Sequence, residues 1–265
     1  LAYHLTELQH YAAETKAILE RIMSENFQIS IDNPQCRLNF SWGIPEIVAS
    51  ADLIESYWID DTCTGYGGED FEDDAIISGN CKTVFQNWLA RNPYYIISLS
   101  AEESQSNWGA AATNTLAYIA DYLWDRSDIM LRNRTPPEIN DGNEIWLSPQ
   151  EAYTRANQLA LDRMNGYRVD YHSSRACDFM DEEKQLSSVP LVKSQITAEG
   201  IIPEDARRDE FCNITNYNGR YQNYPQLHLG HNIQQCELMF RRGDNSCYEN
   251  ISLLDIPEYE FINPS

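Results

Sequence analysis

Residues 148–166 read SPQEAYTRANQLALDRMNG and carry the clearest structural signal in the chain. Ser148 and Glu151 have the spacing of a capping box, and Pro149 stands at the first helical position, where its missing N–H costs little. Apolar residues then return at helical spacing until Gly166, a residue that often ends a helix. The segment predicts an amphipathic helix with a defined start and end.

The same periodicity recurs on both sides of this segment. Apolar residues repeat every three or four positions, as in helices that bury one face. Such stripes lie at 5–22, 47–58, 84–89, 108–123 and about 230–242. One run, YYIISL at 94–99, fits a strand or a helix equally well. We therefore expect a mainly α-helical fold whose long loops, at 59–80, 128–147 and 166–190, carry function.

Composition indicates a globular protein. The 265 residues are 42% hydrophobic, and no apolar run approaches the length that spans a membrane. One large domain or two small ones fit this length. Because no linker or repeat is apparent, we expect residues 1–265 to form a single domain, and a monomer. The formal net charge of −22 makes nucleic acid and anionic membranes unfavourable partners.

Cysteines and glycosylation sequons favour a secreted protein. The seven cysteines include no CxxC pair, which argues against a thiolate zinc site. Four N-glycosylation sequons begin at Asn39, Asn133, Asn213 and Asn250. We therefore expect at least two disulfides, N-glycans and an extracellular location; chance sequons in an Asn-rich chain are the alternative. The chain begins with leucine, so we also expect a processed N-terminus.

Arginines, amides and tyrosines gather between residues 193 and 242. The arginine pair Arg207-Arg208 precedes a loop dense in Asn and Tyr, which also contains Arg220. Guanidinium groups clamp carboxylates, amides donate hydrogen bonds, and a phenol can shuttle a proton. Basic and acidic residues balance within this segment, although the whole chain is strongly acidic. The segment therefore suits an anionic sugar.

Three blocks of the sequence resemble the alginate-lyase type of polysaccharide lyase. They read WGIPEIVASADLIESYW at 42–58, SNWGAAATNTLAYIADY at 106–122, and AEGIIPEDARR at 198–208 with the RGD helix end at 242–244. The Asn-Trp-Gly form of the second block is similar to family 38, which includes glucuronan and alginate lyases. The resemblance spans about half of the chain. It implies an all-α fold, an incomplete (α/α) toroid of antiparallel helix pairs around a substrate groove.

The resemblance also implies a reaction, β-elimination at a uronic acid. One group neutralises the C5 carboxylate, a base removes the adjacent proton, and an acid protonates the leaving glycosidic oxygen. Asn107 matches the neutralising position of the family, although a helix-start residue is the alternative. Arg208 matches the arginine that follows Pro-Glu, and Arg207 stands beside it. Trp108 would line the groove or pack in the core.

The tyrosine of this mechanism has more than one candidate. An insertion after the arginine pair shifts the alignment, so Tyr224 matches when counted back from the helix end and Tyr217 when counted forward. Tyr221 lies between them and, with Arg220, would contact substrate. The family often has histidine beside its asparagine, where this chain has tryptophan. His172, in a long loop, is therefore our candidate base.

Metals and cofactors are not expected. His228 and His231 lie three residues apart and could share a metal on one helical face, but no third ligand is evident. We therefore expect them to occupy satisfied polar positions. The acidic run at 69–74 lacks the regular spacing of a calcium loop, which favours a solvated loop.

Two other functions fit the sequence. A glycoside hydrolase on the same toroid would use two carboxylates, for which Glu102-Glu103 and Glu204-Asp205 are candidates. A secreted sugar-binding protein without activity would use aromatic faces, and the chain has six Trp and 16 Tyr. Ultraviolet absorbance of an unsaturated uronate separates elimination from hydrolysis, and turnover of any polyuronate would exclude the second alternative.

Overall fold

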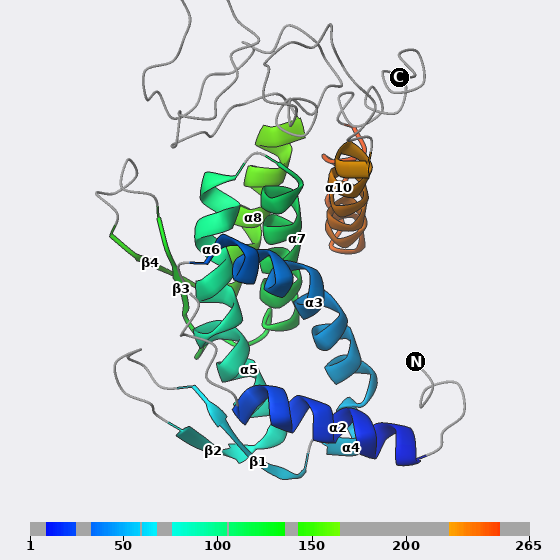
Figure 1. The fold of residues 1–265 in the computed structure, drawn as a ribbon, viewed down its shortest axis with the longest axis vertical. Coiled ribbons are helices and arrows are strands. Elements are labelled where there is room, and N and C mark those ends of the chain that lie inside the picture. The colour runs from blue at the N-terminus through cyan, green and yellow to red at the C-terminus, as the bar shows by residue number, and fades with distance from the viewer. Residues whose placement is uncertain are drawn as a thin grey trace, which may run out of the picture.

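Helices make up most of the part of the chain that the computed structural model describes, which is residues 9–24, 33–58, 60–67, 76–104, 106–135, 143–164 and 223–249 (Figure 1). The helices are α2 (Gln9–Ser24), α3 (Pro34–Leu53), α4 (Glu55–Trp58), α5 (Cys81–Arg91), α6 (Pro93–Glu103), α7 (Asn107–Tyr122), α8 (Pro149–Met164) and α10 (Asn223–Arg241). The strands are β1 (Thr62–Tyr66), β2 (Ile76–Asn80), β3 (Leu131–Asn133) and β4 (Ile145–Leu147). A mainly helical fold is therefore confirmed.

The capping box at the start of α8 forms as predicted. The Ser148 backbone N–H donates to Glu151 Oε2 at 2.8 Å, and the Glu151 N–H donates to Ser148 Oγ at 3.3 Å. Each side chain thus satisfies a backbone donor that the first helical turn leaves without a partner. These bonds hold the pKa of Glu151 below its usual value, because they favour the ionised carboxylate.

One ambiguous element is resolved, and two expectations about element boundaries need correction. The ambiguous run at 94–99 is helical, within α6, because Pro93 starts a helix that is buried on several sides. The predicted loops at 59–80 and 128–147 each contain an antiparallel hairpin, β1–β2 and β3–β4. These strands have three to five residues, too short for an alternating pattern to stand out. α10 begins at Asn223, so it includes residues that we expected in a loop.

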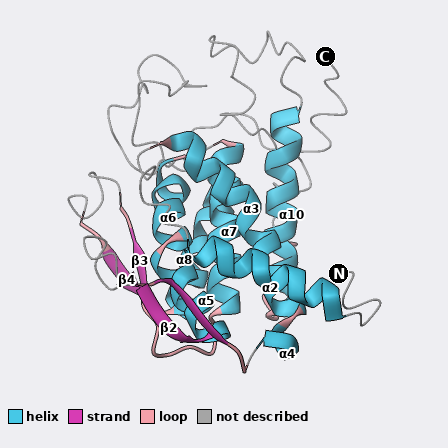
Figure 2. Cartoon of the chain, turned by 60° about the horizontal axis from the view of Figure 1, so that its bottom comes forward, coloured by secondary structure: helices cyan, strands magenta, loops and turns pink. Residues whose placement is uncertain are grey.

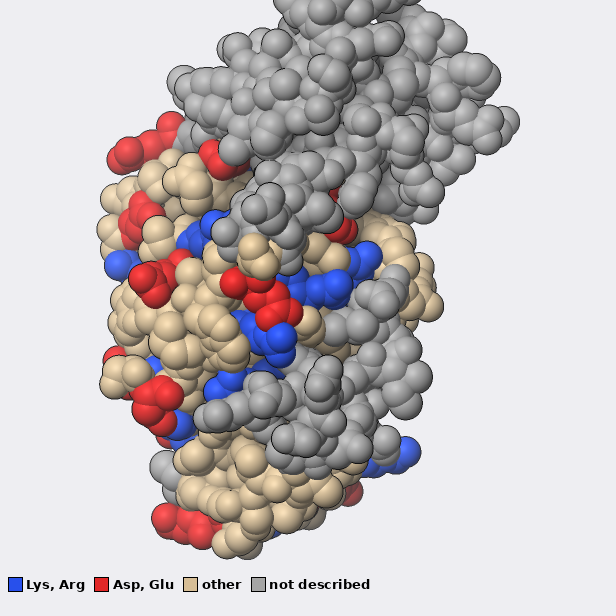
Figure 3. Space-filling view, turned by 90° about the vertical axis from the view of Figure 1, so that its left-hand side faces the viewer, with Lys and Arg blue, Asp and Glu red and all other residues tan. Residues whose placement is uncertain are grey.

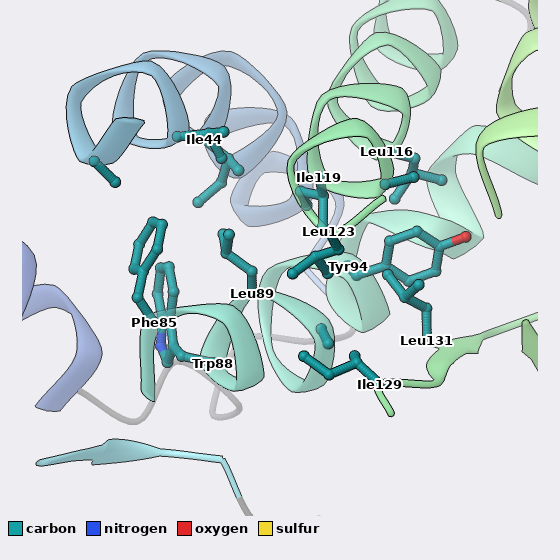
Figure 4. Close-up of a cluster of buried hydrophobic side chains, with 14 of the residues drawn as sticks. Ile44, Phe85, Trp88, Leu89, Tyr94, Leu116, Ile119, Leu123, Ile129 and Leu131 are labelled. Carbon is teal, nitrogen blue, oxygen red and sulfur yellow. The ribbon is translucent and has the colours of Figure 1, made fainter. Parts of the chain in front are cut away.

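The apolar core lies where α3, α5, α6 and α7 meet (Figure 4). Phe85 and Trp88 from α5 are fully buried, with ring centroids 5.8 Å apart. Leu116 and Ile119 from α7 belong to the same cluster. Burial of a large apolar side chain contributes about 1.5–3 kcal/mol, so this cluster is the main source of stability.

Both hairpins lie on one side of the helices (Figure 2). A disulfide joins Cys63 in β1 to Cys81 at the start of α5. A second disulfide joins Cys236 in α10 to Cys247. The expected minimum of two disulfides is therefore met. No helix among the described residues has the length and apolar character needed to span a bilayer.

The sequon at Asn133 conflicts with the packing around it. The Asn133 side chain is fully buried; its Nδ2 donates to Glu102 Oε1 and to the Arg134 carbonyl, and its Oδ1 accepts from the Tyr94 hydroxyl. A glycan on Nδ2 would break these bonds and has no space. Asn39, in contrast, is exposed on α3 and remains a candidate for glycosylation. The sequons at Asn213 and Asn250 lie outside the described residues.

Candidate functional site at the start of α7 and its contact with α10

The first turn of α7 is built by a short turn after α6. Ser106 caps the helix, because its Oγ accepts from the Trp108 N–H at 3.2 Å and lies 3.1 Å from Ser104 Oγ. Gly109 lies directly under this turn: a Cβ atom there would stand 1.9 Å from the Ser104 carbonyl oxygen. Glycine is needed for this close approach. The turn thereby fixes the position of Asn107, the first residue of α7.

Arg163 of α8 also holds this turn in place through hydrogen bonds. Its guanidinium donates to the carbonyls of Ser104 (3.1 Å) and Ala101, and to Thr113 Oγ1 on α7 (3.1 Å). Burial lowers the pKa of Arg163 to about 10, which still leaves it charged at neutral pH. The arginine thus ties α6, α7 and α8 together around the start of α7.

α7 and α10 run in the same direction along their contact. The Asn114 amide donates to Gln234 Oε1 at 2.9 Å. About two helical turns further along α7, Asp121 Oδ1 accepts from Arg242 Nε at 2.5 Å. Seven residues on α7 thus match eight on α10. Asn107 lies seven residues before Asn114, and the matching position on α10, eight residues before Gln234, is residue 226. Asn107 is therefore level with the first two turns of α10.

Polar side chains fill the contact between α10 and its neighbours. His228, Asn232 and Gln235 on α10 are buried, as are Asn107 and Asn114 on α7. Gln235 donates to Asn157 Oδ1 on α8 at 3.0 Å. Asn114 Oδ1 and Gln235 Oε1 are buried acceptors with no hydrogen-bond partner within the described ranges. Buried acceptors of this kind are normally satisfied by water or a ligand, so the contact has the chemistry of a binding site.

His231 is a neutral imidazole at this contact. Burial and, to a smaller extent, the nearby His228 lower its pKa, a hydrogen bond with Gln234 partly offsets both, and the result is a pKa of about 4. At neutral pH the ring therefore offers one donor and one acceptor nitrogen. A base works best with a pKa near the working pH, so His231 is better suited to hydrogen bonding a polar ligand than to removing a proton.

The predicted site residues fall into two groups. Asn107 begins α7 and is fully buried, and Trp108 beside it is partly exposed. Tyr224 lies in the first turn of α10 by its backbone, at the same end of the α7–α10 contact as Asn107; its side chain is outside the described set. The others lie outside the described residues and are His172, Arg207, Arg208, Tyr217, Arg220 and Tyr221.

The carboxylates proposed for a glycoside hydrolase have other partners. Glu102 is 2% exposed, accepts from Arg155 and Asn133, and so belongs to a buried ion pair. Glu103 faces Arg37, with 3.7 Å between the charged atoms. A general acid must be able to reach the substrate, whereas Glu102 is buried and both carboxylates contact arginines of the fold. Glu204 and Asp205 lie outside the described residues.

His228 and His231, which we expect to be satisfied polar positions, both lie on α10, the helix that meets α7; His228 is buried and His231 is partly buried. A usable signal existed: His228, His231, Asn232 and Gln235 repeat at helical spacing, which makes a polar stripe. A buried polar stripe is unusual in a helix, so it could have indicated a site.

Metal-type ligands come together at another place. Within the described ranges, Glu20, Cys63 and Cys81 form a group with the spacing of a metal site. Both cysteines are joined in a disulfide, so they supply no thiolate, and this group does not fit a metal.

Comparisons with known proteins give no relative. No family model matches the chain, and no match was found among the curated proteins or the solved structures. The likeness to polysaccharide lyases thus rests on its sequence blocks alone.

Proposed function

We propose that this protein is a secreted polysaccharide lyase that cleaves a polyuronate such as alginate or glucuronan by β-elimination, within an incomplete (α/α) toroid. The base takes the C5 proton, a double bond forms between C4 and C5, and the C4–O bond breaks. The acid returns a proton to the leaving oxygen. A group that binds the C5 carboxylate stabilises the charge that develops after proton removal.

One observation supports this proposal: the described parts of the blocks that resemble the lyases lie on neighbouring elements. Block 42–58 lies on α3 and α4, block 106–122 covers the cap and length of α7, and residues 242–244 directly follow α10, whereas residues 198–208 lie outside the described residues. α7 packs against both α3 and α10. Arg242, which follows α10, donates to Asp121 of the second block, and next to the first block the Thr115 hydroxyl donates to the Ser41 carbonyl on α3. Residues far apart in the sequence thus surround one helix, as a shared site requires.

The roles follow from the chemistry of each side chain. Asn107 and Arg208 bind the substrate carboxylate, and Arg207, Arg220, Tyr221 and Trp108 hold the sugar chain. Tyr224, or else Tyr217, is the acid and base, with His172 as an additional base. His231 adds a neutral hydrogen-bonding group. Because Asn107 is fully buried, its contact with a carboxylate requires neighbouring side chains to move when substrate binds.

The first test is the absorbance of unsaturated uronate during incubation with alginate, glucuronan and related polyuronates. Replacing Tyr224 with Phe removes only the phenolic oxygen, so turnover should fall by about a hundredfold, the usual contribution of a general acid or base. Tyr217→Phe and Tyr221→Phe are the comparison variants, and each should reduce turnover less than Tyr224→Phe because neither removes the assigned acid and base. Arg208→Ala should weaken binding and turnover together.

The controls separate a wrong residue from a wrong function. If Tyr217→Phe abolishes activity and Tyr224→Phe does not, the lyase assignment holds and Tyr217 is the catalytic residue. If none of the three substitutions affects turnover, the tyrosine mechanism is wrong. If no polyuronate yields absorbance but one still binds, the protein is a sugar-binding protein instead.

A further inference from the structure

The β3–β4 hairpin carries a stack of alternating cationic and aromatic side chains. The Arg134 guanidinium lies 5.5 Å from the Tyr95 ring centroid, and that of Arg132 lies 4.9 Å from it. Arg132 is also 5.9 Å from the Trp146 ring, which Arg91 approaches to 5.2 Å. The order is therefore Arg134, Tyr95, Arg132, Trp146, Arg91. We call these five residues the arginine–aromatic stack.

Four separate elements supply the stack. Arg91 ends α5, Tyr95 lies in the first turn of α6, and Trp146 lies in β4. Arg132 lies in β3, and Arg134 follows that strand directly. Cation–π contacts hold each guanidinium plane near a ring, so the donors of the stack are held in a defined arrangement.

The stack brings three guanidinium groups together on an acidic protein. Glu144 contacts it, accepting from Arg132 and, at 2.6 Å, from the Tyr95 hydroxyl. Figure 3 shows Lys and Arg side chains gathered in the middle of the face that carries the hairpin, around a few acidic ones. Trp146 is 46% exposed there. An exposed tryptophan among arginines is typical of binding surfaces.

We infer that the arginine–aromatic stack is a surface site that binds an extended anionic glycan, with a uronate carboxylate on Arg91 and a sugar ring on Trp146. A polyuronate offers a carboxylate and a ring face on each sugar, and the stack offers guanidinium forks and an aromatic face in alternation. The choice of uronate over other anionic sugars rests on the proposed function; binding of an anionic glycan does not.

This site is separate from the start of α7. α6 runs from the stack, at Tyr95, to the turn that precedes Asn107, and at 1.5 Å per residue this is roughly 15 Å along the helix axis. Substitutions in the stack therefore leave Asn107 and α10 in place. The site would hold substrate near the protein without taking part in the elimination.

The test is calorimetric binding of a short oligoglucuronate to the intact protein, with absorbance recorded in parallel. Arg91→Gln and Trp146→Ala should each weaken binding, and together by about tenfold or more, as expected when a charge-assisted contact is lost. Arg241→Gln is the matched control: this arginine is 72% exposed on α10, outside the stack, and its loss should change affinity less than about twofold. Thermal unfolding confirms that each variant folds.

Further ligands test the sugar assignment. A neutral cello-oligosaccharide should not bind, and polyglutamate should bind more weakly than the uronate and without dependence on Trp146. If polyglutamate binds equally well, or Trp146→Ala does not change uronate binding, the surface is a general anion site and the inference is wrong. If Trp146→Ala unfolds the hairpin, the binding affinity of Arg91→Gln alone tests the inference, because Arg91 lies on α5 and not on the hairpin.

The two proposals can fail separately. If stack variants lose binding while no polyuronate is cleaved, the surface site stands and the lyase function is wrong. If a polyuronate is cleaved and the stack variants bind like the wild type, the lyase function stands and the surface site is wrong.

Discussion

The two sides of α7 differ in chemistry. Toward α3, α5 and α6 the helix presents Leu116, Ile119 and small residues, all within the apolar core. Toward α10 it presents Asn114 and Asp121, and Asn107 stands seven residues before Asn114 in the sequence. The first side buries apolar area and stabilises the fold. The second buries polar groups, two acceptors of which have no hydrogen-bond partner within the described ranges.

This difference separates stability from function. Burying a polar group costs free energy unless it is fully hydrogen-bonded, so stability alone would favour apolar residues at the α7–α10 contact. Positions where a fold departs from this rule are often functional sites. The comparison therefore predicts large stability losses on the core side and small stability losses on the α10 side, with a large activity loss there only for a residue that binds substrate.

The largest effect on stability is expected on the core side. Leu116→Ala removes most of a side chain that is 2% exposed and leaves a cavity, so the free energy of unfolding should fall by about 2–5 kcal/mol. Urea unfolding followed by circular dichroism measures it. A loss below about 1 kcal/mol would mean that this side is loosely packed.

A smaller loss is expected at the start of α7. Gly109→Ala places a methyl group against the Ser104 carbonyl, which overpacks the turn and should cost about 1–3 kcal/mol in the free energy of unfolding. Gly43→Ala on α3 is the matched control, because no atom lies within 4 Å of its added Cβ. That change should stabilise the helix by up to about 1 kcal/mol. Equal effects of the two substitutions would contradict the close approach.

The contact between α7 and α10 should contribute less. Asn114→Ala and Gln234→Ala each remove one side of a hydrogen bond, and in a double-mutant cycle the pair should couple by about 0.5–1.5 kcal/mol. A coupling near zero would show that the bond makes no net contribution to holding α10 on α7.

A pH dependence should arise at His231. Its pKa in the folded protein is about 4, below the ordinary 6.5, so the unfolded chain takes up a proton first as the pH falls. The free energy of unfolding should therefore decline between about pH 6.5 and about pH 4, and show no contribution from this group at higher pH. Comparison with His231→Gln isolates the effect: the variant should decline less over that interval, and parallel curves would contradict the lowered pKa.

The helices could be predicted because their signals are local. The capping box at Ser148 and the apolar repeats in α5 and α7 depend on neighbours in the sequence alone. The helix over 94–99 was ambiguous since burial on several sides removes the polar half of the pattern. The short hairpins were missed for a similar reason, because three to five residues give no clear alternation.

The site could be predicted only in part. Asn107 was identified from its sequence block, and the structure puts it level with the first turns of α10. The polar stripe of His228 and Gln235 gains meaning only from the packing of α10 on α7, which no local pattern encodes. The arginine–aromatic stack was missed entirely, because its five residues come from two separate segments, 91–95 and 132–146, and meet only in the folded chain.

Turnover of a polyuronate by Asn107→Ala, compared with Asn114→Ala, tests the central claim most directly. Both substitutions remove a buried amide from the polar side of α7, but only Asn107 is proposed to bind the substrate carboxylate. We predict that kcat/KM, from the absorbance of unsaturated uronate, falls by about a hundredfold or more for Asn107→Ala, the usual cost of losing a donor to a developing negative charge. Asn114→Ala should retain most of the wild-type kcat/KM, although its free energy of unfolding should be similar to that of Asn107→Ala. Equal losses in the two variants, or no absorbance with any polyuronate, would contradict the account.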